Sequence, residues 1–219
     1  ALARSVVLLE ELDEATYEVG HAINAAALAL AKLDLYELSA AWWERMRQVA
    51  DELSDAMLRT LYSYNSVWLH LNWAFELELV GNDEQAQEHY RRTIEAYAST
   101  PPGAEVVRHS AWPSEVALQA CAARAMLGEG ASLQRELRRH LVIVAPTQRH
   151  EATLIGHLAL ARVYANEGDR HRALEETEIA CAASDTLPRL PVPAVRAYWE
   201  YAEQLRQRDG TSPQAEAYA

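Results

Sequence analysis

Apolar residues recur along this chain at intervals of three and four, the spacing of amphipathic helices, and short polar or glycine-containing segments separate the runs. Ala, Leu, Glu, Arg and Gln, which are strong helix formers, dominate these runs. Ser54, Pro113 and Thr147 are start signals for the helices that follow them. The pattern predicts an all-α fold of about ten helices, at residues 2–12, 14–32, 35–53, 55–80, 83–98, 113–128, 131–144, 147–167, 170–184 and 193–209.

Two segments, 70–94 and 157–181, share one arrangement of residues around a turn. The turns are Gly81-Asn82 and Gly168-Asp169, and weaker copies have turns near residues 33, 128 and 210. Glycine accepts the left-handed conformation that ends a helix, and Asp or Asn after it caps the next helix. Small residues at fixed distances from the turn let two antiparallel helices approach closely: Ala74, Ala86, Ala161, Ala173 and Ala180. Each hairpin leaves an apolar face open, so the pattern predicts stacked neighbours.

This register resembles the tetratricopeptide repeat, most closely over 70–94 and 157–181. The turns here are 40 to 48 residues apart, whereas the usual unit has about 34 residues. Such elongated units are similar to those of bacterial signalling and transcription regulators, and HEAT-type or armadillo-type arrays are the alternative classification. The resemblance implies a right-handed superhelix of stacked antiparallel helical hairpins, an α-solenoid forming a single domain over residues 1–219. Because the first helix has no upstream partner, we expect this domain to be part of a longer protein.

In tetratricopeptide proteins the first helix of each hairpin lines a concave groove that binds peptides or partner helices. The resemblance implies the following groove residues in this chain: Trp68, Leu71, Phe75, Glu78, Leu118, Ala122, Met126, Leu158, Arg162 and Asn166. Arg162 and Asn166 are four residues apart on one helix face, and a guanidinium beside an amide suits a peptide backbone or a carboxylate. The alternative interpretation makes these two ordinary solvated residues and places Phe75, next to Trp73, in the core.

The net charge of −12 disfavours nucleic-acid binding, because an acidic surface repels phosphate. No apolar run is long enough for a membrane span, and the acidic start differs from a secretory signal. Cys121 and Cys181, the two cysteines, lie in alanine-rich runs and predict no disulfide framework, so we expect a cytoplasmic protein. Lys32 is the only lysine, a bias typical of a GC-rich bacterial genome.

Motifs of catalysis and of cofactor binding are missing from the sequence. His150 and His157 are seven residues apart, and Leu154 stands where a zinc helix H-E-x-x-H would have its second histidine. There is no C-x-x-C pair and no phosphate-binding glycine loop. The sequence therefore predicts a non-enzymatic module without metal or cofactor, which binds a protein or peptide and regulates an attached output domain. Two alternatives stay open: a scaffold that forms homodimers through its terminal helices, and an all-α domain that binds a small molecule.

Overall fold

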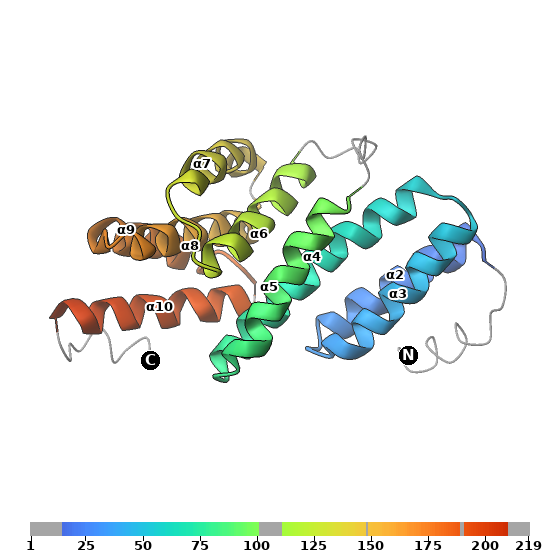
Figure 1. Ribbon diagram of the computed structural model, residues 1–219, viewed down its shortest axis with the longest axis horizontal. Coiled ribbons are helices and arrows are strands. Elements are labelled where there is room, and N and C mark those ends of the chain that lie inside the picture. The colour runs from blue at the N-terminus through green and yellow to red at the C-terminus, as the bar shows by residue number, and fades with distance from the viewer. Residues whose placement is uncertain (1–14, 101–110, 148, 189–190, 210–219) are drawn as a thin grey trace. The chain divides into compact units, whose positions relative to one another are not determined.

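The computed structural model describes residues 15–100, 111–147, 149–188 and 191–209 (Figure 1). Within these ranges the chain forms nine α-helices, one short 3-10 helix and no strand, which confirms the all-α prediction. The predicted helix boundaries agree with the observed ones to within three residues, and the helix expected at 2–12 lies outside the described ranges. The elements are α2 (Tyr17–Ala31), α3 (Tyr36–Glu52), α4 (Ala56–Leu79), α5 (Asp83–Ala98), α6 (Trp112–Met126), α7 (Ser132–Val144), η2 (Ala145–Thr147), α8 (His150–Asn166), α9 (Arg170–Ser184) and α10 (Val192–Asp209).

Five of the helices in the described ranges end in one recurring backbone motif, and in three of them the left-handed residue is a glycine. Gly81, Gly128 and Gly168 have positive φ angles of 77°, 95° and 80°, as predicted. The N–H of the residue after each glycine donates to a carbonyl five residues earlier, for example Asp169 to Tyr164 at 2.9 Å. This is the Schellman pattern, in which a left-handed residue lets the chain reverse while the last carbonyls stay hydrogen-bonded. The repeated sequence register is therefore a repeated helix stop.

The predicted start signals are right in part. The Asp169 carboxylate accepts a hydrogen bond from the Arg172 N–H and caps α9, and proline stands in the first turn of α6. Ser54 is not a cap: it adopts the left-handed stop conformation with φ 53°, and Asp55 accepts from Leu58 N–H instead. Thr147 is not a cap either, because it belongs to η2 and α8 begins only at His150. Both residues take part in the end of one helix and therefore cannot begin the next.

The chain divides into two compact units, Ala1–Leu69 with Glu95–Arg108, and His70–Ile94 with His109–Ala219. The boundary falls inside α4 and α5. The single-domain superhelix stays a prediction. Among the described residues, no helix is both long and apolar enough to cross a membrane.

In the first unit α2 and α3 form a hairpin that packs on the first part of α4. The Asn24 carboxamide oxygen accepts hydrogen bonds from Trp43 Nε1 at 3.0 Å and from Asn65 Nδ2 at 2.6 Å, so one half-buried amide links all three helices. The Ser39 hydroxyl donates to the carbonyl of Ala27 at 2.8 Å. These bonds satisfy polar groups that the close approach of the helices removes from water.

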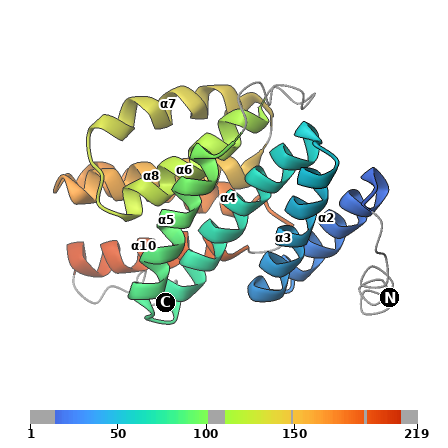
Figure 2. The same ribbon diagram turned by 45° about the vertical axis from the view of Figure 1, so that its right-hand side comes forward.

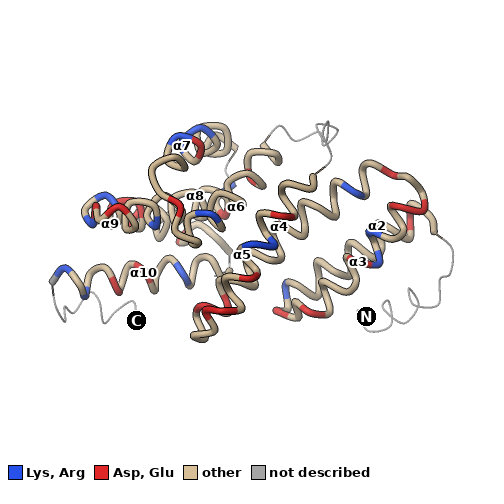
Figure 3. Tube along the Cα trace, in the orientation of Figure 1, with Lys and Arg blue, Asp and Glu red and all other residues tan. Residues whose placement is uncertain are grey.

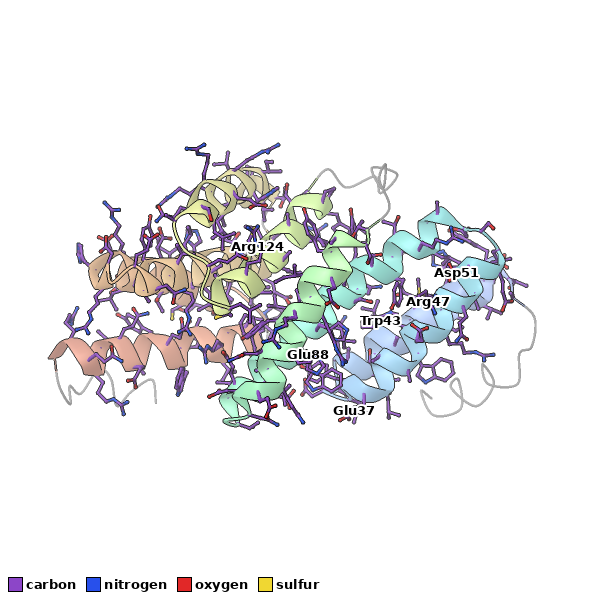
Figure 4. The ribbon with its side chains drawn as sticks, in the orientation of Figure 1. Glu37, Trp43, Arg47, Asp51, Glu88 and Arg124 are labelled. Atoms are coloured by element: carbon purple, nitrogen blue, oxygen red, sulfur yellow. The ribbon has the colours of Figure 1, made fainter. Side chains whose placement is uncertain are left out.

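Ion pairs lie on the outside of this unit. Arg47 pairs with Glu44 and, at 2.8 Å, with Asp51, which also pairs with Arg59 at 2.9 Å (Figure 4). All four side chains are at least 40% exposed, so the pairs add little to the stability of the fold.

In the second unit α8 is the central helix. It packs against α6, α7, α9 and α10, and the views in Figures 1 and 2 show α10 running beside the α8/α9 hairpin. Its fully buried side chains are Leu154, Ile155, Leu158, Ala159, Leu160, Ala161 and Val163. Ala161, Ala173 and Ala180 are buried where α8 and α9 meet, which confirms the predicted role of small residues. Successive hairpins of this unit therefore contact one another along the chain.

Candidate functional site

Most of the apolar residues assigned to a groove lie in the core instead. Leu71, Phe75, Leu118 and Leu158 are completely buried, and Ala122 and Met126 are at most 7% exposed. The groove assignment of these six residues is therefore wrong for this structure, and the alternative that placed Phe75 in the core is right. They belong to one apolar cluster that also includes Ala194 and Ala197 of α10. Trp68 is half-buried on the part of α4 that belongs to the first unit.

Two predicted site residues, Glu78 of α4 and Arg162 of α8, are brought together by α10. The guanidinium of Arg196 lies 3.2 Å from the Glu78 carboxylate and 3.0 Å from that of Glu200. Arg162 lies 3.9 Å from the same Glu200 carboxylate. Arg196 and Glu200 are almost completely buried, with side chains 5% and 8% exposed. We call this set of four charged residues the ion seam; it joins α4, α8 and α10.

The ion seam is incompletely hydrogen-bonded. Five buried atoms in it or beside it make no hydrogen bond of normal geometry with the described residues: Glu78 Oε2, Tyr90 Oη, Arg162 Nε, Arg196 Nε and Glu200 Oε2. Burial raises the pKa of the Glu200 carboxyl, although the two arginines act in the opposite direction. Burial and the negative charge of Glu78 likewise raise the pKa of Tyr90. The seam thus holds opposite charges in a place where desolvation is costly.

Arg196 has a further partner on its own helix. Its guanidinium carbon lies 4.7 Å from the centroid of the Trp199 ring, a cation–π distance. Trp199 is 48% exposed and covers the arginine from the outside. The sequence predicts this helix but assigns no role to Arg196 and Glu200. The residues that stand out in it are the apolar stripe Tyr198, Trp199 and Tyr201, which the homodimer alternative would use. A charged pair at i and i+4 beside Ala194 and Ala197 is the signal that marks the buried side.

A cleft of about 560 Å³ opens in the same unit, between the end of α8, the first half of α9 and the last half of α10. Its lining consists of Ala165, Arg170, His171, Ala173, Leu174, Gln204, Gln207 and Arg208. The lining contains two arginines and no acidic residue, although the chain has a net charge of −12. Figure 3 shows both basic and acidic residues in α9 and α10, so the basic character belongs to the lining of the cleft and not to these helices as a whole. The cleft is therefore a basic site in an acidic protein.

The cleft has an apolar floor and a fixed polar wall. Leu174 packs against Leu205, which is 1% exposed. The Gln204 amide donates to the Thr177 hydroxyl at 3.1 Å, so this side chain is held in one orientation. Asn166, predicted for the groove, is exposed at the end of α8 and donates from Nδ2 to the Ala125 carbonyl at 3.1 Å. It ties α8 to the end of α6 and does not line the cleft.

His157, His70 and His89 of this unit lie close to other side chains of the protein. His157 Nδ1 lies 2.7 Å from the Glu176 carboxylate, whose other oxygen accepts from Arg138 at 3.2 Å, so a polar group joins α7, α8 and α9. His70 and His89 lie with their Nδ1 atoms 3.0 Å apart, and burial lowers their pKa values to about 3 and about 4. No three His, Cys, Asp or Glu side chains in the described ranges are placed to hold a metal ion.

Charge clusters also hold the α6/α7 hairpin. Arg124, labelled in Figure 4, pairs with Glu129 at 2.8 Å and with Glu136 at 2.9 Å across the Gly128 turn. This cluster is a structural clamp, since it joins the two helices next to their connecting turn.

Comparisons of the chain with models of protein families, with curated proteins and with solved structures found no match.

Proposed function

We propose that this chain is a non-catalytic helical binding module, similar to tetratricopeptide domains, which binds a peptide segment of a partner protein in the cleft between α8, α9 and α10. Such a module would regulate an attached output domain of a signalling or transcription-regulatory protein.

The basic cleft is the observation that carries this proposal. Arg170 can donate charge-assisted hydrogen bonds to a ligand, and Gln207 can bond a peptide backbone. Leu174 offers apolar contact at the floor. Charge complementarity favours a peptide with acidic residues next to an apolar side chain. The cleft replaces the groove implied by the family resemblance, whose first-helix residues are largely buried here.

The test is selection of binders from a displayed random peptide library, followed by affinity measurement with fluorescein-labelled peptides. We expect selected peptides to bind the unmodified chain, and to lose at least about tenfold in affinity with Ala165→Trp, which fills the cleft, and with Arg170→Gln. Arg139→Gln is the matched control, because Arg139 is exposed on α7 and does not line the cleft. Peptides that bind equally well to the Ala165→Trp variant would refute the assignment of the site.

A small-molecule ligand is the second candidate, and the size of the cleft favours it. Cavities of roughly 300–1,000 Å³ are typical of small-molecule sites, and this one measures about 560 Å³. Thermal-shift screening of anionic metabolites separates the two proposals. A compound that stabilises the unmodified chain but not Ala165→Trp would favour the small molecule.

A further inference from the structure

Helix α10 is anchored differently from the rest of its unit. The fully buried side chains of α8 include Leu154, Ile155 and Leu158, whereas α10 buries mostly alanines and a single leucine, Leu205. Alanine removes little apolar area from water, so each such contact contributes less than a buried leucine. None of the larger apolar residues of α10 other than Leu205 is fully buried: Val192, Tyr198 and Tyr201 pack against the core while only partly buried, and Val195 and Trp199 are 44% and 48% exposed. Apolar burial therefore holds α10 less firmly than it holds α8.

The ion seam supplies much of the remaining attachment. It joins the first half of α10 to α4 and α8 through Arg196 and Glu200. A buried ion pair gives little net stability, because desolvation offsets most of the attraction between the charges. Arg196 Nε and Glu200 Oε2, which make no normal hydrogen bond, increase that cost. When α10 moves away from α4 and α8, water hydrates the charged groups of the ion seam. This hydration offsets part of the free energy lost when the ion pairs separate.

We propose that α10 undocks from α4, α8 and α9 as a unit, while the other helices of the second unit stay folded. Elements with few large buried side chains open locally at a lower free energy than the whole domain. Undocking removes Gln204, Gln207 and Arg208 from the cleft, so the docked state is the one that binds a ligand there. That consequence rests on the proposed function, but the undocking itself does not and is tested without a ligand.

The two cysteines of the chain provide a reporter of this motion. Cys181 on α9 is 7% exposed, and Tyr198 of α10 contacts its backbone carbonyl at 3.5 Å. Cys121 on α6 is 1% exposed, and the charged groups that act on its thiol come from α6, α7 and their turn. Burial raises the pKa of both thiols to about 12, so neither reacts readily while it is covered. Undocking of α10 uncovers Cys181 alone, whereas global unfolding uncovers both.

The experiment is alkylation of the full chain with iodoacetamide at pH 8 in increasing urea below the unfolding transition, with each cysteine followed by mass spectrometry. We expect Cys181 to react at least about tenfold faster than Cys121, with a weaker dependence on urea, because local opening exposes less surface than global unfolding. Equal rates and equal urea dependence at the two cysteines would show that α10 leaves only when the domain unfolds, and would overturn the proposal.

Variants test whether the opening that exposes Cys181 is the undocking of α10. Arg196→Met leaves two buried carboxylates short of a partner and so destabilises the docked state relative to both the undocked and the unfolded state; it should raise the rates at Cys181 and at Cys121 by on the order of 100-fold each. Gly156→Ala crowds Leu141 and Leu118 and leaves the contacts of α10 intact, so it should raise the rate at Cys121 and leave the rate at Cys181 nearly unchanged. Arg206→Met is the matched control, because Arg206 is 61% exposed on the same helix and should change neither rate. Glu200→Gln, a smaller perturbation, should change both rates by the same, smaller factor. If Arg196→Met accelerates neither cysteine, or if Gly156→Ala accelerates both equally, the proposal fails.

Discussion

Replacement of Arg196 by methionine tests how the ion seam contributes to stability. Methionine keeps an unbranched stem of similar length but removes the guanidinium that faces Glu78 and Glu200. The two carboxylates are 15% and 8% exposed. After the change, the only seam cation is Arg162, at 3.9 Å from Glu200. The variant thus keeps the packing of the stem and leaves buried negative charge without its main partner.

The magnitude follows from the burial of these groups. Removal of one partner from a buried ion pair costs about 3–5 kcal/mol, because the other charge stays in a poorly solvating environment. The contact with Trp199 at 4.7 Å disappears in the same step, and a cation–π contact of this kind contributes about 0.5–2 kcal/mol. The two effects overlap, so we expect a decrease of about 3–5 kcal/mol in the free energy of unfolding. A typical domain has about 5–15 kcal/mol in total, so the variant should be close to unfolding.

Urea unfolding at pH 7, followed by circular dichroism, measures this decrease. Arg206→Met should cost less than about 0.5 kcal/mol, because its partner Glu203 is on the same exposed surface. The triple variant Arg196→Met, Glu78→Gln, Glu200→Gln should recover most of the stability, since it removes the uncompensated charges. A decrease below about 1 kcal/mol for Arg196→Met, or no recovery in the triple variant, would refute the interpretation of the seam as a buried and mutually dependent set of charges.

Three further changes test separate parts of the second unit. His70 and His89 have folded pKa values below the usual 6.5, so the folded state binds fewer protons than the unfolded state at acidic pH. Their contribution to stability should be complete above pH 7 and should decrease by about 2 kcal/mol for each histidine down to pH 5. In urea unfolding across this pH range, the variant with both histidines replaced by glutamine should lose less stability than the unmodified chain. Gly156→Ala should lower the unfolding free energy by about 1–3 kcal/mol, because the new Cβ would lie 2.6 Å from Leu141 Cδ2; thermal unfolding measures it. Asp169→Ala should cost about 1 kcal/mol because the α9 cap is removed, measured in the same way.

Each of these has its own contradicting result. A histidine double variant with the same pH profile as the unmodified chain would mean that the pair titrates normally. A neutral Gly156→Ala would mean that α7 moves away from α8 at no cost. For the cap, Asp169→Asn is the control, because an asparagine side chain can still accept the Arg172 N–H bond; equal destabilisation by Ala and Asn would exclude capping as the cause.

The helices could be predicted because their ends are local. Gly81, Gly128 and Gly168 stop three helices through backbone conformations that depend on a few neighbouring residues. Asp169 caps the following helix by a bond that reaches only three residues. The failures at Ser54 and Thr147 are also local, since both residues take part in ending one helix and cannot begin the next. Sequence periodicity and local end signals therefore predict almost all of the secondary structure of the described residues.

The site could not be predicted in the same way, because it depends on where α10 lies. Tyr198, Trp199 and Tyr201 form an apolar stripe along α10, yet Trp199 is half-exposed and the charged Arg196 is buried. The rotation of α10 is set by partners on α4 and α8 that are far away in the sequence. The basic cleft likewise joins residues of three helices, and each of its arginines on its own is an ordinary surface residue.

Glu78 and Arg162 are the two groove residues that the structure does place in a shared polar environment, and their chemistry explains why. A charged residue on the inner face of a packed helix loses hydration unless an opposite charge compensates for it. Leucine or phenylalanine at such a position is equally compatible with a ligand or with the core, and here Leu71 and Phe75 are in the core. A buried charge, in contrast, requires a partner of opposite sign. The sequence could thus indicate that Glu78 and Arg162 have a partner, but not that the partner is a helix of the same chain, and Arg196 and Glu200 of α10 provide it.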